Sequence, residues 1–335
     1  MGFYETLIAG LREITMLAEI LKVELQNIYQ NFNKTNYNEN NCFLCGNFCE
    51  TKTQEHIFPK WLQKNYSLWN QKLLLINNSK IPYRNLTVTC CNKCNNEHLS
   101  KLEKDFQKIL IKPDSALSFE EEIIIFQWCA KILYATRYKE LTLLADRSNI
   151  ENGFLITPEE LESYSSLHLF LQTIRYKFEF IGQKPWSIFV FNCDDDSFFY
   201  QNNLKRLSFF IKFGKRAFCI LFEDNNEIEH RLQKFKNLTK YTLNNAQITE
   251  VISYLFYGAS LRKNTPKYLT TITNNHFSIF TTGNLIFDEW NNDIFGINFY
   301  YLLIKNKIPV SESIHKENCS KITFLVDEKG INMLE

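Results

Sequence analysis

The chain of 335 residues is 45% hydrophobic and 22% charged, which is enough apolar material for a sizeable core and for more than one domain. Its formal net charge of +1 excludes a protein that coats nucleic acid over its whole surface, so such a partner would bind a local patch. Because no run of about 18 uninterrupted apolar residues occurs, we expect a soluble protein with no membrane partner.

Residues 1–32 are expected to hold an amphipathic helix. No proline interrupts them, glycine is absent after Gly10, and apolar residues repeat at heptad spacing. The repeating residues are Tyr4, Leu7, Leu11, Ile14, Ala18, Leu21, Leu25, Ile28 and Phe32. Such a stripe can dock on the rest of the chain or pair with a second copy to form a homodimer, and both alternatives stay open.

Cysteine placement indicates the chemistry of the next segment. Six of the ten cysteines lie between Cys42 and Cys94, after an Asn-rich stretch over 31–41 that we interpret as a linker. In a chain of this length with no recognisable signal peptide, such clustering favours thiolate metal binding over disulfides. We therefore expect a reducing, cytoplasmic location.

Residues 42–112 are predicted to form one small module. Its predicted elements are a loop carrying Glu55 and His56, two short strands around Lys72–Ile76 and Leu86–Thr89, and a helix from about Asn95 to Ile111. This stretch is also the most basic part of the chain, with eleven Lys and Arg residues against five acidic residues. Local contact with nucleic acid is the function class that this charge favours.

A helical connector is predicted over residues 113–180. Ser118-Phe-Glu-Glu121 has the pattern of a capping box and should open a long helix that runs to about Asp146. Thr157-Pro158-Glu-Glu160 should open another, with proline at the first helical position.

Residues 181–335 are predicted to form a mainly antiparallel α+β domain with no assigned role, and the fold class expected for the whole chain is α+β. Strands are predicted at Ile188–Phe191, Leu207–Phe213, Ala217–Phe222, Phe277–Phe280, Ile297–Ile304 and Ile322–Val326, with a hairpin turn at Gly214-Lys215 and a helix near Ile248–Arg262. The many Phe and Tyr residues here are typical of sheet packing, and a base-stacking platform is the alternative.

Two Cys-x2-Cys pairs indicate a zinc site. Cys42 and Cys45 form the first pair, and Cys91 and Cys94 form the second. Pairs at this spacing, separated by a long excursion, are typical of four tetrahedral thiolate ligands, and such a closed site is structural. Cys49 and Cys90 are then spare, because neither fits the two-residue spacing as well.

Between and after these pairs lie residues suited to hydrolysis of a phosphodiester. Glu55-His56 falls between the pairs, and Asn95 directly follows the last cysteine. Hydrolysis requires a base that takes a proton from water, which an imidazole can supply, and a cation that neutralises the transition state. A carboxylate and an amide oxygen can together hold Mg²⁺ or Mn²⁺.

These motifs resemble the HNH, or ββα-metal, endonuclease family in its zinc-stapled branch. The match lies in Glu55-His56-Ile57-Phe58-Pro59 and in Cys91-Asn92-Lys93-Cys94-Asn95, within a resemblance that spans roughly residues 42–135. The resemblance implies that His56 is the general base, that Glu55 and Asn95 ligate the catalytic cation, and that water is the nucleophile. It also implies DNA as the substrate, with RNA not excluded.

Two further residues are candidates for this site. The resemblance suggests that Asn85 holds the loop that orients His56, although it lies ten residues before Asn95 where the family spacing is nine. His98 follows Asn95 by three residues and is a candidate ligand or phosphate contact, with a solvated helix histidine as the alternative.

Phosphate contacts are expected from five cations of the module, and the alternative for each is a solvated surface charge. These are Lys60, Lys64, Arg84, Lys93 and Lys101. The sequence thus predicts a metal-dependent DNA endonuclease, and the resemblance adds a setting in bacterial anti-phage defence, alone or beside an ATPase subunit. The competing hypothesis is a non-catalytic four-cysteine zinc module that binds nucleic acid or a protein partner.

Overall fold

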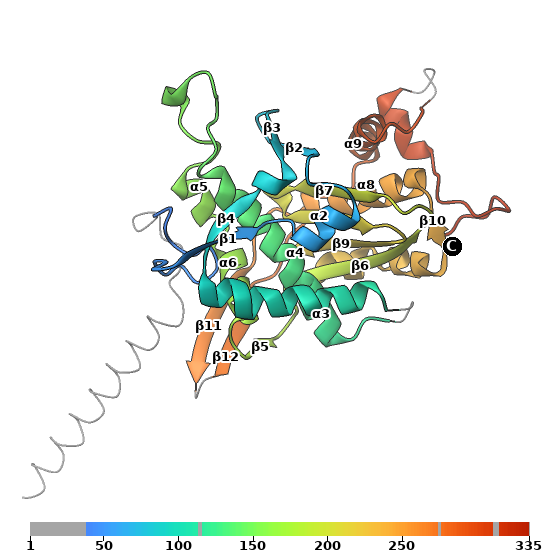
Figure 1. Ribbon diagram of the computed structural model, residues 1–335. Coiled ribbons are helices and arrows are strands. Elements are labelled where there is room, and N and C mark those ends of the chain that lie inside the picture. The colour runs from blue at the N-terminus through green and yellow to red at the C-terminus, as the bar shows by residue number, and fades with distance from the viewer. Residues whose placement is uncertain (1–37, 113–115, 274–275, 311–314, 335) are drawn as a thin grey trace, which may run out of the picture.

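The computed structural model describes residues 38–112, 116–273, 276–310 and 315–334 (Figure 1). The helix predicted for residues 1–32, and with it the proposed dimer, lies outside the described residues. Within the part of the chain that is described, no helix is long and apolar enough to cross a membrane. Helices and strands are both abundant, which is consistent with the predicted α+β class.

The cysteine-rich module, which we call the finger, is built on strands β1 (Lys52–His56) and β4 (Thr87–Cys91). They are antiparallel, with Lys52 opposite Cys91 and His56 opposite Thr87. A single π-helical turn (Cys94–Leu99) and helix α3 (Ser100–Leu110) follow directly. The sequence predicted this order of strand, strand and helix, but it predicted a different segment as the first strand.

That strand is the main correction to the predicted finger. Residues Glu55 and His56 were expected in a loop, whereas they end β1. The strand around Lys72–Ile76 instead forms a separate hairpin, in which β2 (Lys72–Leu74) pairs with β3 (Lys80–Pro82). The sequence of β1 is polar throughout, so hydrophobic alternation could not reveal it. A short helix, α2 (Lys60–Asn65), lies between β1 and this hairpin.

The connector contains the central helix of the molecule, α4 (Phe119–Glu140), which is buried along most of its length. The predicted capping box is present: Ser118 Oγ accepts from the backbone N–H of Glu121, whose carboxylate accepts in return. The helix ends six residues before the predicted Asp146. The second box also holds, with Thr157 capping α5 (Pro158–Glu162), and α6 (Ser165–Leu171) follows.

The C-terminal half contains a five-stranded sheet in the order β10-β6-β9-β8-β7, antiparallel except where β10 joins β6. Its strands are β6 (Trp186–Cys193), β7 (Phe198–Asn203), β8 (Ser208–Phe213), β9 (Arg216–Phe222) and β10 (Thr242–Leu243). The predicted hairpin between β8 and β9 is confirmed, and Gly214 adopts the left-handed φ of +58° that favours glycine. Strand β7 lies at one edge of the sheet, paired only with β8.

The described chain also contains a three-stranded sheet, three further α-helices and several 3₁₀ segments, among them Gln233–Lys240. The sheet has the order β11 (Lys267–Thr273), β12 (His276–Thr282), β5 (Phe178–Ile181). The α-helices are α7 (Glu227–Arg231), α8 (Asn245–Ser260) and α9 (Asn292–Lys305), and another 3₁₀ segment spans Lys316–Lys321. The prediction of a strand over 297–304 was therefore wrong. Its apolar, aromatic composition resembles a strand, but Asn291 caps two N–H groups and starts a helix. Residues 322–326 form no strand beyond one bridge at Val326.

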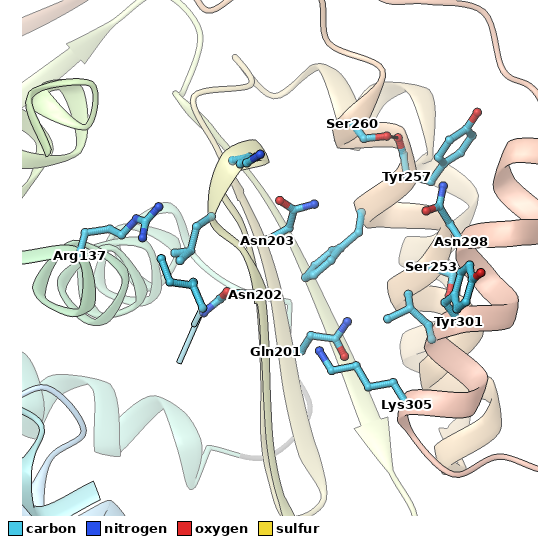
Figure 2. Close-up of a pocket in the computed structure, with 15 residues that line it drawn as sticks. Arg137, Gln201, Asn202, Asn203, Ser253, Tyr257, Ser260, Asn298, Tyr301 and Lys305 are labelled. Carbon is cyan, nitrogen blue, oxygen red and sulfur yellow. Dashed lines mark hydrogen bonds between the residues drawn. The ribbon is translucent and has the colours of Figure 1, made fainter. Parts of the chain in front are cut away.

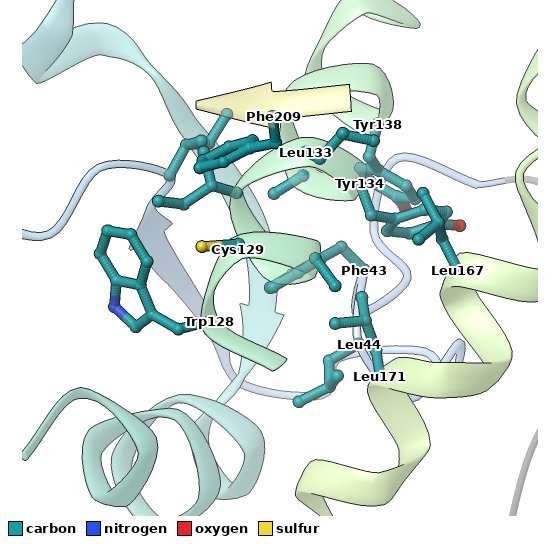
Figure 3. Close-up of a cluster of buried hydrophobic side chains, with 14 of the residues drawn as sticks. Phe43, Leu44, Trp128, Cys129, Leu133, Tyr134, Tyr138, Leu167, Leu171 and Phe209 are labelled. Atoms are coloured by element: carbon teal, nitrogen blue, oxygen red, sulfur yellow. The ribbon is translucent and has the colours of Figure 1, made fainter. Parts of the chain in front are cut away.

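One hydrophobic cluster joins the finger, α4 and the five-stranded sheet. Figure 3 shows Phe43 packed beside α4, and Phe209 of β8 packs against the same helix. Phe106 of α3 stacks on Trp128 of α4 with ring centroids 4.1 Å apart. A second cluster packs α8 on the other face of the sheet. The finger and the sheet consequently share a core rather than meeting as two separate bodies.

Candidate functional site

The four predicted cysteine ligands converge at one end of the β1–β4 pair. The sulfur atoms of Cys42, Cys45, Cys91 and Cys94 all lie within 4.8 Å of one another. A tetrahedral zinc–thiolate site, with bonds of about 2.3 Å, requires sulfur atoms roughly 3.8 Å apart. The spacing and the donor type therefore fit a metal such as zinc, and the four residues form a possible tetrathiolate metal site.

Backbone hydrogen bonds hold this cluster in place. The first knuckle closes through Gly46 N, which donates to the carbonyl of Cys42 at 2.8 Å. Phe43 N donates to the carbonyl of Thr89 at 3.0 Å, which ties the knuckle to β4. Because Cys91 ends β4 and Cys94 opens the helix, the second pair is positioned by the same strand.

The spare cysteines lie beside this cluster. Cys90 is fully buried, and its sulfur is 3.7 Å from that of Cys42. Hydrogen bonds from the thiols of Cys45, Cys49 and Cys90 hold the pKa of Cys42 well below its usual range, whereas the pKa of Cys90 is raised by its bond to Cys42 and by burial.

Glu55 forms a buried ion pair that the sequence analysis did not predict. Its Oε1 lies 2.6 Å from Nζ of Lys131, a fully buried residue of α4. The same Nζ lies 3.3 Å from Oε1 of Glu103 on α3. Burial opposes the charged amine, but Glu55 and Glu103 outweigh it and raise the pKa of Lys131. The group is one ammonium between two carboxylates.

Hydrogen bonds complete this group, which we call the Lys131 network. Glu103 Oε2 accepts from the indole N–H groups of Trp61, at 2.8 Å, and Trp128, at 3.0 Å. Lys131 Nζ also donates to the backbone carbonyls of His56, at 3.0 Å, and Ile57, at 3.2 Å. The network therefore fixes both the carboxylate of Glu55 and the backbone at the end of β1. The spacing Trp128-x2-Lys131 is visible in the sequence, but nothing in it shows the ion pair.

Asn95 lies on the same side of β1 as Glu55. Its Nδ2 donates to Thr53 Oγ1 at 2.9 Å, and Thr53 and Glu55 project from the same face because side chains alternate along a strand. Thr53 and Glu55 are separated by about 7 Å along the strand. Among the described residues, neither Oδ1 of Asn95 nor Oε2 of Glu55 has a hydrogen-bond partner. Two oxygen atoms without protein partners in the described residues therefore lie on one face of β1.

His56 ends the strand and is partly exposed. Gln63 Nε2 lies 3.4 Å from its Nδ1, and the ring of Trp69 packs 5.9 Å away, centroid to centroid. Burial, and then the charge of Lys60, lower the pKa of His56, against the opposing effect of Glu55. The imidazole is therefore neutral at neutral pH, the state in which it can accept a proton. Gln63 and Trp69 were not expected at this position.

The remaining candidates, Asn85, Arg84 and His98, lie in the turn before β4 and in the π-helical turn. Asn85 is exposed in a 3₁₀ turn, and in the described part of the chain its side chain forms no hydrogen bond to His56. Arg84 donates to the Trp69 carbonyl at 3.4 Å and to Asn70, so it holds the loop that carries Trp69. His98 is half-buried, and burial, followed by the charges of nearby cations, lowers its pKa. The structure therefore gives Arg84 a packing contact in addition to any role with phosphate.

The four candidate lysines lie on the surface of the finger. Lys60 and Lys64 are exposed on α2, and Lys93 is exposed between the second pair of cysteines. Lys101 is 80% exposed at its side chain and pairs with Asp105 at 2.8 Å. Of these four lysines, Lys60 is the one whose charge lowers the pKa of His56.

Comparisons with protein-family models, with curated proteins and with solved structures find no match to this chain.

Proposed function

We propose that the protein is a metal-dependent endonuclease of the HNH type, stabilised by a structural zinc ion on its four clustered cysteines. One observation carries the proposal. Glu55 and Asn95 present oxygen atoms without partners among the described residues on one face of β1, and His56, the next residue along the chain, ends that strand with a lowered pKa. A carboxylate, an amide oxygen and an imidazole are the groups that a hydrolytic centre of this kind requires.

In this proposal each residue has a separate role. Oε2 of Glu55 and Oδ1 of Asn95 would hold Mg²⁺ or Mn²⁺, which when bound would neutralise charge developing on the scissile phosphate. His56 takes a proton from the attacking water. Lys131 occupies Oε1 of Glu55, so the second oxygen is the one left for the cation. Exposed lysines such as Lys60 and Lys64 would contact the flanking phosphates.

The test is cleavage of supercoiled plasmid by purified protein with Mg²⁺, with Mn²⁺ and with EDTA, alongside His56→Ala. We expect nicked or linear products that require the metal and fall at least about 100-fold in the variant, as loss of a general base predicts. His230→Ala is the matched control, because His230 is exposed on α7 and far from β1 in the chain. Equal melting temperatures would show that both variants are folded. Cleavage that survives His56→Ala would contradict the mechanism.

Substrate identity requires parallel reactions with single-stranded and double-stranded DNA and RNA of one sequence. DNA is the substrate proposed, so faster cleavage of RNA would correct that part and leave the roles of the residues intact. His56→Ala must abolish cleavage of whichever substrate is preferred.

A second candidate is a zinc module that binds nucleic acid or protein without cleaving it. The observation that favours it is the buried pair of Glu55 with Lys131, which neutralises a carboxylate that the catalytic role needs for a cation. The two proposals differ in cation affinity. Mn²⁺ binding that is lost in Glu55→Gln supports the nuclease, and Mn²⁺ binding unaffected by that change supports the module.

A further inference from the structure

Away from the finger's candidate centre, a cavity of about 550 Å³ opens at the free edge of strand β7. Figure 2 shows it between this edge and the helices α8 and α9. Ile76, at the β2–β3 hairpin of the finger, and Arg137 of α4 also line it. Its volume lies in the range of sites that hold small organic ligands.

Gln201 of β7 gives the cavity an unused hydrogen-bonding group. The residue is 6% exposed, and its Oε1 is buried without a hydrogen-bond partner among the described residues. A buried polar atom without a partner costs roughly 1–3 kcal/mol, so native proteins keep few of them. Figure 2 places the Gln201 side chain on the α9 side of the strand, where it and Lys305 point toward one another. An N–H or O–H group of a ligand would satisfy this oxygen.

Two lysines supply positive charge without a carboxylate to balance it. Lys205, in the turn after β7, and Lys305, at the end of α9, both line the cavity and are exposed. Within the described part of the chain, neither forms an ion pair. Arg137 differs, because its guanidinium already forms an ion pair with Glu140 and donates a hydrogen bond to the hydroxyl of Tyr164. The unbalanced charge of the two lysines favours an anionic group on the ligand.

Aromatic rings and amides form the rest of the lining. Phe256 and Tyr257 of α8 are 7% and 6% exposed, and Tyr301 of α9 is 55% exposed. Asn298 of α9 donates through Nδ2 to the carbonyl of Ile294 and retains its Oδ1. A flat ring with N–H donors is the ligand shape that such walls accept, through ring packing and amide hydrogen bonds.

We propose that this cavity binds a mononucleotide, with its phosphate at one of the two lysines and its nitrogen heterocycle between Gln201, Asn298 and the aromatic rings. The three requirements, an anion, a planar ring and a hydrogen-bond donor, are met together by that class of molecule. The site is separate from the nuclease centre, so its existence does not depend on cleavage.

The test is binding to the full chain, measured by calorimetry and by the shift in melting temperature. The probes are ATP, AMP, GTP and GMP. Adenosine and inorganic phosphate are tested separately, as the two components of a nucleotide. We expect saturable binding of at least one nucleotide below about 1 mM, and at least tenfold weaker binding of adenosine and of phosphate. Absence of binding by all four nucleotides, or phosphate binding as tight as that of the nucleotide, would overturn the proposal.

Variants locate the site. Lys205→Ala with Lys305→Ala should weaken nucleotide binding at least tenfold, as should Gln201→Leu, and Lys267→Ala on exposed β11 is the matched control. Because Gln201 is buried, its variant is interpreted only where its melting temperature matches the wild type. The double lysine variant changes only exposed side chains. It therefore decides the result if Gln201→Leu is destabilised. Unchanged affinity in that variant would refute the assignment to this cavity.

Discussion

The finger contains two buried polar groups that are built in opposite ways. The cysteine cluster draws its four residues from two short motifs, whereas the Lys131 network joins β1, α3 and α4, with Glu55 and Lys131 separated by 76 positions. The thiolates repel one another and need a cation to stay together. The network already contains its own cation. The cysteine cluster would therefore depend on a bound metal, whereas the Lys131 network depends on the tertiary fold.

Removal of zinc should have the largest effect on stability, because structural zinc sites contribute about 10–16 kcal/mol in small zinc domains. We expect about one zinc ion per chain in the purified protein, and a large drop in melting temperature when a strong chelator is added. Cys94→Ser should have the same effect, and Cys193→Ser, at a buried cysteine outside the cluster, should retain its zinc. A melting temperature indifferent to chelation would contradict the comparison.

Lys131→Met should destabilise the protein by about 3–5 kcal/mol, since the half-buried carboxylates of Glu55 and Glu103 lose the cation that they share. Zinc content should stay at its wild-type value, which separates this group from the cysteine cluster. The triple variant with Glu55→Gln and Glu103→Gln should recover part of the loss, because it leaves no unpaired charge. Chemical denaturation measures all three proteins. If the triple variant is no more stable than Lys131→Met, electrostatics is not the cause.

A buried carboxyl in the C-terminal half, Glu223, provides a third case, because its side chain forms no ion pair with any residue that the structure describes. Burial raises the pKa of Glu223 to about 7 against the opposing charge of Arg262, and its Oε1 has no hydrogen-bond partner among the described residues. The folded protein therefore binds this proton more tightly than the unfolded chain, and stability falls as pH rises from about 4.5 to 7.

Glu223→Gln removes that titration. We expect its free energy of unfolding to exceed that of the wild type by up to about 3 kcal/mol at pH 8, with the difference disappearing near pH 4. Denaturation curves at several pH values measure this. Asp224, whose pKa burial raises to about 6, titrates in both proteins and so cancels in the difference. A constant difference at every pH would indicate a packing effect instead.

Asn95→Ala should have the smallest effect on stability, about 0.5–1.5 kcal/mol, because it removes only the hydrogen bond to Thr53. The same change should abolish metal-dependent cleavage if Oδ1 is a ligand. Thr53→Val removes that hydrogen bond and the one from Thr53 Oγ1 to the Cys90 carbonyl, but it leaves the Asn95 amide in place. It should therefore cost at least as much stability as Asn95→Ala and still retain cleavage. Equal cleavage losses in both variants would mean that the bond, not the ligand, matters.

The cysteine cluster could be predicted from sequence because its spacing is a local property of two turns. The capping boxes at Ser118 and Thr157 could be predicted for the same reason, since each satisfies N–H groups within four residues. Strand β1 could not, because its inward residues are polar and only tertiary partners such as Lys131 and Asn95 stabilise them. The helix α9 was missed because its composition favours a strand and its cap, Asn291, is a single residue.

The continuous hydrophobic cluster limits how this protein can evolve. Phe43 in the first knuckle and Phe222 in β9 belong to one packed group, and the rings of Trp61 and Phe213 stack across the junction. A recombination event that exchanged the C-terminal half would also replace the wall against which the finger folds. Because of this shared packing, we expect the two halves to be inherited together. We also expect the protein to melt in one cooperative transition.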